Sequence, residues 1–186
     1  MSRSVEERIV IRPIAAADLA ETNAIYNHYV LSSTATWRAT PEPLEEHVAW
    51  VASHGAQHPV LVAEIDGRVV GWGALSQLQQ SAAYAGTVED SLWIHHDFRH
   101  RGLGRALLTE LIVRARSIGH HTIIARVDSD QAASLALHQA HDFRRSPFCE
   151  RSARSSAAGW MRCICSFFSR GAAKVSVESL RTPVLP

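Results

Sequence analysis

Five short segments of the chain have the apolar pattern of β-strands. Each is a run of β-branched residues or an alternation of apolar and polar positions. The five segments are residues 9–12, 60–64, 69–75, 87–95 and 122–127. Asp66-Gly67 lies between the second and third segments and is typical of a tight hairpin turn, so these two strands are expected to pair antiparallel.

Four other segments repeat apolar residues at the helical period. They are residues 19–29, 44–51, 106–118 and the stretch that ends at Ala140. Asp18 is expected to cap the first, Gly119 to end the third, and Asp128-Ser129-Asp130 to cap the fourth. The order of strands and helices predicts an α/β (α+β) sheet that is antiparallel in its first part and parallel later.

Length and composition favour one α/β domain with an appendage. The chain has 186 residues, of which 46% are apolar, enough to build a core. It has no apolar run long enough to span a bilayer, and its first ten residues lack the apolar segment of a secretory signal, so a cytoplasmic protein is expected. The net charge of +1 gives no electrostatic case for a nucleic-acid partner.

The composition changes near Arg145. Residues 1–145 carry 13 arginines, 16 acidic residues and all 11 histidines. Residues 146–186 carry six basic residues, two acidic residues and all three cysteines. We therefore divide the chain into a domain at 1–145 and an atypical Ser/Arg-rich tail at 146–186.

Residues 92–108 combine the features of a phosphate-binding turn. An expected strand runs into a turn that contains Gly102 and Gly104, and a long amphipathic helix follows. Glycines allow a close approach to the backbone, and the first helical turn offers N–H groups without helical partners. Arg99, Arg101 and Arg105 add positive charge, which suits a pyrophosphate. The glycine spacing alone is equally compatible with a plain loop-to-helix junction that carries surface arginines.

Two other phosphate motifs are excluded. The chain contains no P-loop pattern, and Gly71-x-Gly73 lacks the third glycine and the following helix of a dinucleotide fingerprint. Arg99-x-x-Gly102-x-Gly104 instead resembles the acetyl-CoA pyrophosphate signature of GNAT-type N-acetyltransferases.

Four further motifs resemble the phosphinothricin and methionine sulfoximine acetyltransferase branch of that family. They are Ile11-Arg12-Pro13, Ile25-Tyr26-Asn27-His28, Tyr84-x-x-Thr87-Val88-Glu89-x-Ser91 and Ala133-Ser134-Leu135-Ala136-Leu137-His138. The resemblance covers about residues 9–145. It implies a GNAT fold, which is a mixed, splayed sheet flanked by helices, with acetyl-CoA between strands 87–95 and 122–127.

The resemblance also implies roles for single residues. Glu89 is expected to be the catalytic base that takes a proton from the acceptor amine. The backbone of residues 92–94 is expected to bind pantetheine, and a bulge beside it to polarise the thioester carbonyl. The expected cofactor-binding residues are Leu92, Trp93, Ile94, Arg99, His100, Arg101, Gly102, Leu103, Gly104, Arg105, Gln131 and Ser134. The residues expected at the acceptor substrate are Tyr26, Trp37, Gln79, Tyr84 and Thr87.

Several side chains have an alternative role in packing or in metal binding. For Tyr26, Trp37 and Trp50, packing in the core is as well supported as a place in the acceptor pocket, and His138 is expected to be a packed helix residue. The histidines His95, His96 and His100 suggest a metal site. However, no second group of metal-ligating residues supports it, so no metal is expected.

The predicted function is an N-acetyltransferase that moves an acetyl group from acetyl-CoA to the amine of a small molecule, such as phosphinothricin or methionine sulfoximine. Direct transfer is expected because the chain up to Phe143 has no cysteine. The alternatives are a catalytically impaired acyl-CoA-binding remnant and a protein or peptide N-acetyltransferase. The resemblance further implies a homodimer, provided that the C-terminal region folds, and no membrane partner.

The chain departs from the family pattern in four places. Gln131 stands where the family has Asn, and Asp142 where it has a left-handed Gly, which costs about 1 kcal/mol. Gln79 stands where relatives often have an Arg for a substrate carboxylate, which weakens the case for such an acceptor. The family pattern is lost after Ser146, and we interpret the tail as the product of a shifted reading frame, with a divergent extension as the alternative. The apolar patch at 160–168 either supplies one strand or is exposed.

Overall fold

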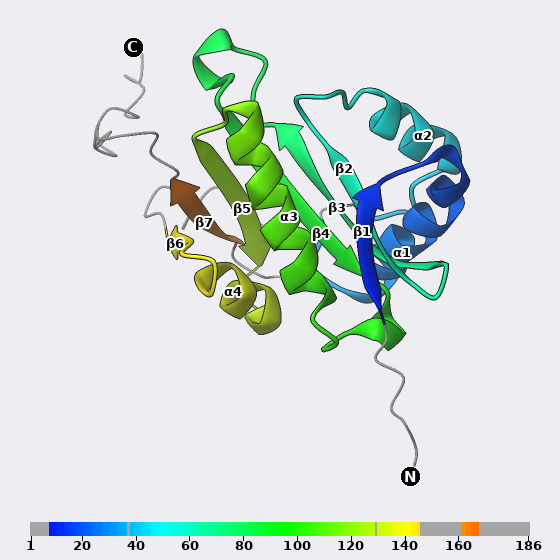
Figure 1. Cartoon of the computed structure of the whole chain (residues 1–186). Coiled ribbons are helices and arrows are strands. Elements are labelled where there is room, and N and C mark those ends of the chain that lie inside the picture. The colour runs from blue at the N-terminus through cyan, green and yellow to red at the C-terminus, as the bar shows by residue number, and fades with distance from the viewer. Residues whose placement is uncertain (1–7, 37, 129, 146–160, 168–186) are drawn as a thin grey trace.

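A mixed sheet forms the centre of the computed structural model, which describes residues 8–36, 38–128, 130–145 and 161–167 (Figure 1). The seven described strands lie in the order β1-β2-β3-β4-β5-β7-β6. Their bounds are β1 (Ile9–Pro13), β2 (Val60–Ile65), β3 (Arg68–Gln77), β4 (Thr87–Ile94), β5 (Thr122–Asp128), β6 (Arg144–Arg145) and β7 (Met161–Phe167). Neighbouring strands pair antiparallel except β4 and β5, which are parallel.

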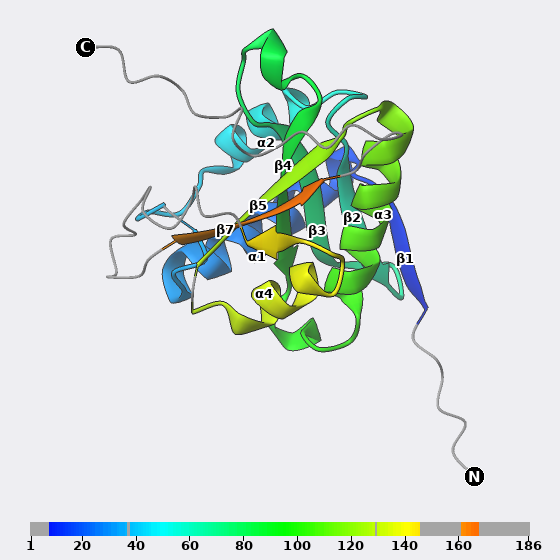
Figure 2. The ribbon, with the colours of Figure 1, turned by 90° about the vertical axis from the view of Figure 1, so that its left-hand side faces the viewer.

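Helices cover both faces of this sheet (Figure 2). The helices α1 (Leu19–Ser32) and α2 (Leu44–Ala52) lie on one face, and α3 (Leu103–Ile118) lies across the other. The short helix α4 (Ala132–Gln139) follows β5 and lies close to β6. None of the described helices has the length and apolar character needed to cross a membrane.

The helices and strands agree with the sequence prediction except at some ends. Asp66 and Gly67 have positive φ angles of 50° and 80°, as the expected hairpin turn requires, and Gly119 ends α3 with φ 106°. Asp18 is the N-cap residue of α1, as predicted, but its carboxylate accepts the N–H of Ala15 at 2.7 Å and makes no capping hydrogen bond to α1. The predicted cap of α4 is wrong, because Gln131 is its N-cap and makes no side-chain hydrogen bond.

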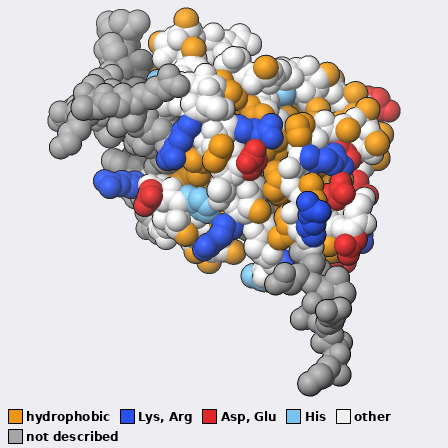
Figure 3. All heavy atoms as spheres, viewed as in Figure 1, with side chains coloured by type: hydrophobic (Ala, Val, Ile, Leu, Met, Phe, Trp, Pro, Cys, Tyr) orange, Lys and Arg blue, Asp and Glu red, His pale blue; other side chains and the backbone are white. Residues whose placement is uncertain are grey.

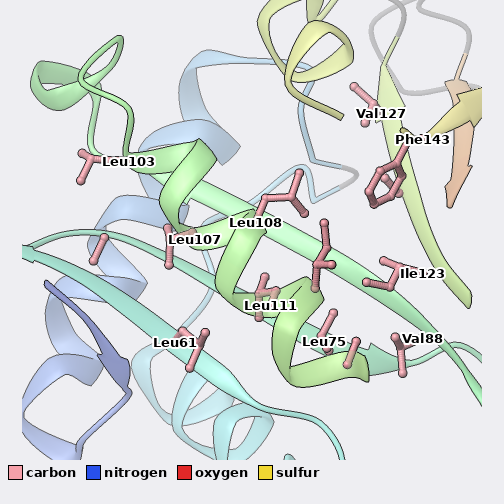
Figure 4. Close-up of a cluster of buried hydrophobic side chains, with 14 of the residues drawn as sticks. Leu61, Leu75, Val88, Leu103, Leu107, Leu108, Leu111, Ile123, Val127 and Phe143 are labelled. Atoms are coloured by element: carbon pink, nitrogen blue, oxygen red, sulfur yellow. The ribbon is translucent and has the colours of Figure 1, made fainter. Parts of the chain in front are cut away.

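Two apolar clusters lie on the two faces of the sheet. The larger cluster packs α3 against the sheet and is shown in Figure 4. Its fully buried members include Leu107, Leu108 and Leu111 of α3. The second cluster packs Ile25 of α1 against Trp72 of β3. On the face that carries α3, basic and acidic side chains are interspersed among apolar ones (Figure 3).

The strand β7 lies inside the sheet, between β5 and β6. It pairs antiparallel with β5, from Thr122–Phe167 to Asp128–Met161. Of the two alternatives for the apolar patch, a strand is therefore the one that the structure shows for Met161–Phe167. Residues 146–160 and 168–186 lie outside the described residues, so the division of the chain near residue 145 and the shifted reading frame stay predictions.

The parallel strands β4 and β5 separate part-way along their length. They pair only from Thr87–Thr122 to Asp90–Ala125. Beyond Asp90, β4 continues against β3 as far as Ile94, and β5 continues against β7. This confirms the expected splayed sheet and opens a gap that leads from Asp90 toward the start of α3.

Candidate active site

A cavity of about 930 Å³ opens where β4 and β5 separate. Residues 89–94 of β4 and 125–128 of β5 line its two sides. The first turn of α3 and one side of α4 line one end, and α1 with His47 and Trp50 of α2 lines the other. The splay of the sheet therefore joins the predicted phosphate-binding turn and the predicted acceptor region in one space.

The turn before α3 presents backbone N–H groups to this cavity. His100 and Gly102 both have left-handed φ angles, 63° and 82°, and Gly102 is the N-cap of α3 without a side-chain hydrogen bond. The N–H of Ala106 makes a helical bond to the carbonyl of Gly102 at 3.0 Å. The N–H groups of residues 103–105 precede it and have no partner within the helix. With the helix dipole, they make a site for an anion.

Two of the three predicted arginines face this anion site. Arg99 and Arg105 line the cavity, whereas Arg101 is not among the lining residues and lies over the ring of Phe98, 4.8 Å from its centroid. The Nε of Arg99 donates to the Tyr29 hydroxyl at 3.3 Å, and that hydroxyl donates to the carbonyl of Ile94. Tyr29 of α1 thus holds Arg99 beside the end of β4.

The open edge of β4 offers fewer backbone groups than predicted. The N–H of His95 donates to the carbonyl of Val70 in β3 at 2.8 Å. Successive residues of a strand direct their backbone groups to opposite sides, so those of Trp93 also face β3. Those of Leu92 and Ile94 face the gap, where Tyr29 already occupies the Ile94 carbonyl.

The predicted bulge in β4 is wrong for the described strand. Its register against β3 runs without a shift from Gly71–Ile94 to Gln77–Val88. The register shift lies in β2 instead, between Ala63 and Glu64. Because β4 has no bulge, the first residue beyond Asp90 that directs its backbone N–H and C=O groups into the gap is Leu92.

Glu89 lines the cavity on the side of α1. It shares a face of β4 with Trp93, whose ring contacts Tyr26 edge-on at 4.9 Å. The carboxylate of Glu89 accepts two hydrogen bonds from the guanidinium of Arg126 in β5. Burial raises the pKa of Glu89 above its ordinary value, and Arg126 opposes this rise.

The next residue, Asp90, points to the opposite face and forms a buried pair that the sequence prediction missed. Its Oδ2 lies 2.9 Å from Nε2 of His138 in α4, and its buried Oδ1 hydrogen-bonds to none of the described residues. The other ring nitrogen of His138 lies 2.7 Å from the carbonyl of Ser134. A carbonyl oxygen can only accept, so Nδ1 of His138 carries a proton. A second proton lies between Nε2 and Oδ2 of Asp90. Burial disfavours a charged ring, but Asp90 outweighs it and raises the pKa of His138.

Tyr26 and Trp50 are the two described candidates for the acceptor pocket that line the cavity. The hydroxyl of Tyr26 lies 2.8 Å from Oγ1 of Thr36. Trp37 lies outside the described residues. Gln79, Tyr84 and Thr87 are not among the lining residues, because they lie at or before the start of β4, away from the end that leads to α3.

The chain is similar to known proteins of one family. The family model described as "Acetyltransferase (GNAT) family" matches residues 22–143. An L-amino acid N-acyltransferase, MnaT of Escherichia coli, is 38% identical over 134 residues, which are 72% of this chain and 78% of that protein. An L-methionine sulfoximine/L-methionine sulfone acetyltransferase of Pseudomonas aeruginosa is 40% identical over 131 residues, 69% and 76% of the two chains.

The chain belongs to the acetyltransferase (GNAT) family. A solved phosphinothricin acetyltransferase of Sinorhizobium meliloti, in complex with acetyl-CoA, superposes with a TM-score of 0.82 at 28% identity and covers 95% of this chain and 97% of its own. The chain is therefore an N-acetyltransferase that uses acetyl-CoA, as the sequence motifs predicted.

The residues of this GNAT cavity fit acetyl-CoA. The N–H groups of residues 103–105 and the guanidinium groups of Arg99 and Arg105 suit the diphosphate. The open edge at Leu92 suits an amide of the pantetheine arm. Gln131 and Ser134, both predicted to bind the cofactor, line the cavity at the start of α4.

A histidine cluster beside the cavity brings three potential metal-ligating side chains together. Side-chain ligand atoms of His95, His96 and Asp97 lie within 4.8 Å of one another. The ring of His96 is stacked on His95 at 4.4 Å and on His28 at 4.1 Å. Both ring nitrogens of His95 face N–H donors, Nδ1 that of Asp97 at 3.3 Å and Nε2 the guanidinium of Arg68 at 3.2 Å, and the absence of a metal stays a prediction.

Proposed function

We propose that this GNAT enzyme acetylates the α-amine of small amino-acid analogues, such as the methionine sulfoximine and phosphinothricin for which its relatives are named. The observation that carries the proposal is the position of two proton-handling groups in one cavity. Glu89 and the Asp90–His138 pair line it from opposite faces of β4, at the point where β4 and β5 separate.

Glu89 is the base in this proposal. An amine attacks a thioester only when its nitrogen has a free lone pair, so a proton must leave it. The carboxylate of Glu89 lies at the cavity with its basicity increased by burial, which suits the removal of that proton. No cysteine is among the described residues that line the cavity, which supports direct transfer to the amine rather than transfer through a covalent acyl-cysteine.

The Asp90–His138 pair supplies a proton on the other side. Acetyl-CoA brings the acetyl thioester, whose C–S bond breaks as the new C–N bond forms. The departing sulfur then needs a proton, and His138 carries one because Asp90 stabilises the charged ring. One proton thus passes from the amine to Glu89, and another passes from the Asp90–His138 pair to the departing sulfur.

Replacement of Glu89 tests this proposal. Glu89→Gln is expected to lower kcat about 10²- to 10⁴-fold, the usual contribution of a positioned base. The affinity of the Glu89→Gln variant for acetyl-CoA should stay close to that of the unchanged enzyme. The matched control is Glu110→Gln, because Glu110 also pairs with an arginine, Arg114, but lies on α3 outside the cavity lining.

Thiol release from acetyl-CoA with a panel of amines measures turnover, and titration calorimetry measures acetyl-CoA binding. Equal turnover of Glu89→Gln and the unchanged enzyme would remove Glu89 from the mechanism. Binding of acetyl-CoA without thiol release for any amine would instead favour the impaired remnant, and turnover only with peptides would favour a protein acetyltransferase. The cytoplasmic location, the homodimer and the lack of a metal stay predictions.

A further inference from the structure

One arginine of the cavity lies apart from the anion site at α3. Three arginines are among the described lining residues: Arg99 and Arg105 beside the start of α3, and Arg126 on β5. Gln79, the residue that the sequence placed at the acceptor, does not line the cavity. Of these three arginines, Arg126 is therefore the one that lies away from the proposed diphosphate site.

The strand geometry directs Arg126 toward the acceptor side. In β5, Ile123, Ala125 and Val127 belong to the cluster under α3. Because side chains alternate along a strand, Arg126 faces the opposite side, which is also the side of Glu89 and Trp93 on β4. Glu89 lies beside Ile124 in the parallel register, two residues before Arg126 on the same face.

The guanidinium of Arg126 keeps unused donor capacity. Its Nε and one terminal nitrogen donate to the two oxygens of Glu89. The other terminal nitrogen makes no hydrogen bond with any described residue, and the side chain is 44% exposed. A guanidinium binds carboxylates through two parallel N–H donors, so a second carboxylate can approach its outer edge.

We infer that Arg126 binds the α-carboxylate of the acceptor and thereby selects amino acids over simple amines. The inference rests on the proposed function, in which Glu89 receives the amine. In an α-amino acid a single carbon separates the amine from the carboxylate. A nitrogen held at Glu89 therefore brings the carboxylate close to the guanidinium that is paired with Glu89.

The local charges favour a zwitterion over a simple anion. Glu89 lines this part of the cavity and repels an isolated carboxylate. A zwitterionic acceptor offers its ammonium to Glu89 and its carboxylate to Arg126, so that unlike charges are adjacent throughout. The acceptor carboxylate also draws Arg126 partly away from Glu89, which leaves Glu89 freer to accept a proton.

The test compares methionine sulfoximine with its primary amide, which has the same shape and amine but no carboxylate charge. Because Arg126→Gln also removes the partner of Glu89, the ratio of the two KM values is the readout. The variant is expected to raise KM for the acid about tenfold to 100-fold more than KM for the amide, the loss of a charge-assisted hydrogen bond. Arg126→Lys keeps the charge without the planar donor pair and should give an intermediate KM. Arg114→Gln, a surface arginine paired with Glu110 on α3, is the matched control.

Each outcome separates this inference from the proposed function. Turnover of the amide shows that a variant is folded, and calorimetry of the acid with the CoA-saturated enzyme gives a second readout that needs no turnover. If Arg126→Gln raises KM equally for both acceptors, or for neither, Arg126 does not bind the carboxylate, although the proposed function stands. If the unchanged enzyme acetylates neither acceptor, the proposed function fails, and this inference fails with it.

Discussion

Two glycines at opposite ends of α3 allow a matched test of the anion site. Gly102 and Gly119 both have left-handed φ angles, 82° and 106°, and a Cβ added at either would meet no atom of the described residues within 4 Å. Replacement of either by alanine therefore adds backbone strain but no collision. That strain costs about 1–2 kcal/mol, and each kcal/mol lowers the Tm of a chain of this size by about 2–4 °C.

The two variants differ in what the strained residue supports. Relief of the strain at Gly102 moves the N–H groups of residues 103–105, which we propose to hold the diphosphate of acetyl-CoA. The loss of one charge-assisted hydrogen bond costs about 1.5–3 kcal/mol, or about a tenfold to 100-fold increase in Kd. Gly119 lies at the far end of the helix, so Gly119→Ala should bind acetyl-CoA as the unchanged protein does.

Urea unfolding and titration calorimetry with acetyl-CoA measure the two effects separately. We expect similar losses of stability for Gly102→Ala and Gly119→Ala, and a loss of affinity only for Gly102→Ala. If both variants bind acetyl-CoA equally well, the backbone at the start of α3 does not hold the diphosphate. Weaker binding of acetyl-CoA by Gly119→Ala would show that affinity follows the stability of the helix rather than the geometry of its first turn.

Two further predictions concern stability. Asp142 has a positive φ of 64°, which costs about 1 kcal/mol, and the greater freedom of glycine in the unfolded chain offsets at least half of this cost. Asp142→Gly should therefore stabilise the fold by up to about 0.5 kcal/mol, and a lower urea midpoint would contradict this. The raised pKa of His138 stabilises the fold while the ring is protonated; this contribution is complete below the unfolded value of about 6.5 and is lost as the pH rises through the folded value. As the pH rises through that value, the free energy of unfolding of Asp90→Asn should therefore fall less than that of the unchanged protein. Urea unfolding at several pH values measures this, and an equal fall in both proteins would refute the pairing.

The strands and helices could be predicted because their signals are local. The hairpin at Asp66-Gly67 and the helix stop at Gly119 depend on the conformations that these residues themselves prefer. The direction of the Asp18 side chain could not be predicted from its neighbours along the chain. Its carboxylate forms an ion pair with Arg12 at 2.6 Å, while Arg12 also pairs with Glu64 on β2, so contacts across the sheet determine where Asp18 points.

The candidate site divides in the same way. The turn before α3 is a contiguous motif and was found from its glycines. The pair of Asp90 and His138 joins residues 48 positions apart, and the pair of Glu89 and Arg126 joins residues 37 apart. Their proximity depends on where β5 and α4 pack against β4, which neither charge nor spacing along the chain reveals.

The alternation of β4 explains how one strand can carry both of the proton steps that we propose. Adjacent residues of a strand point to opposite faces, so Glu89 faces α1 and the acceptor, whereas Asp90 faces α4 and His138. The splay begins at this point, so both groups reach the gap between β4 and β5. Separate faces keep the proposed base, Glu89, apart from the proposed proton donor, the Asp90–His138 pair. A shift of β4 by a single residue would exchange the two faces, and the long antiparallel pairing of β4 with β3 protects the site against it.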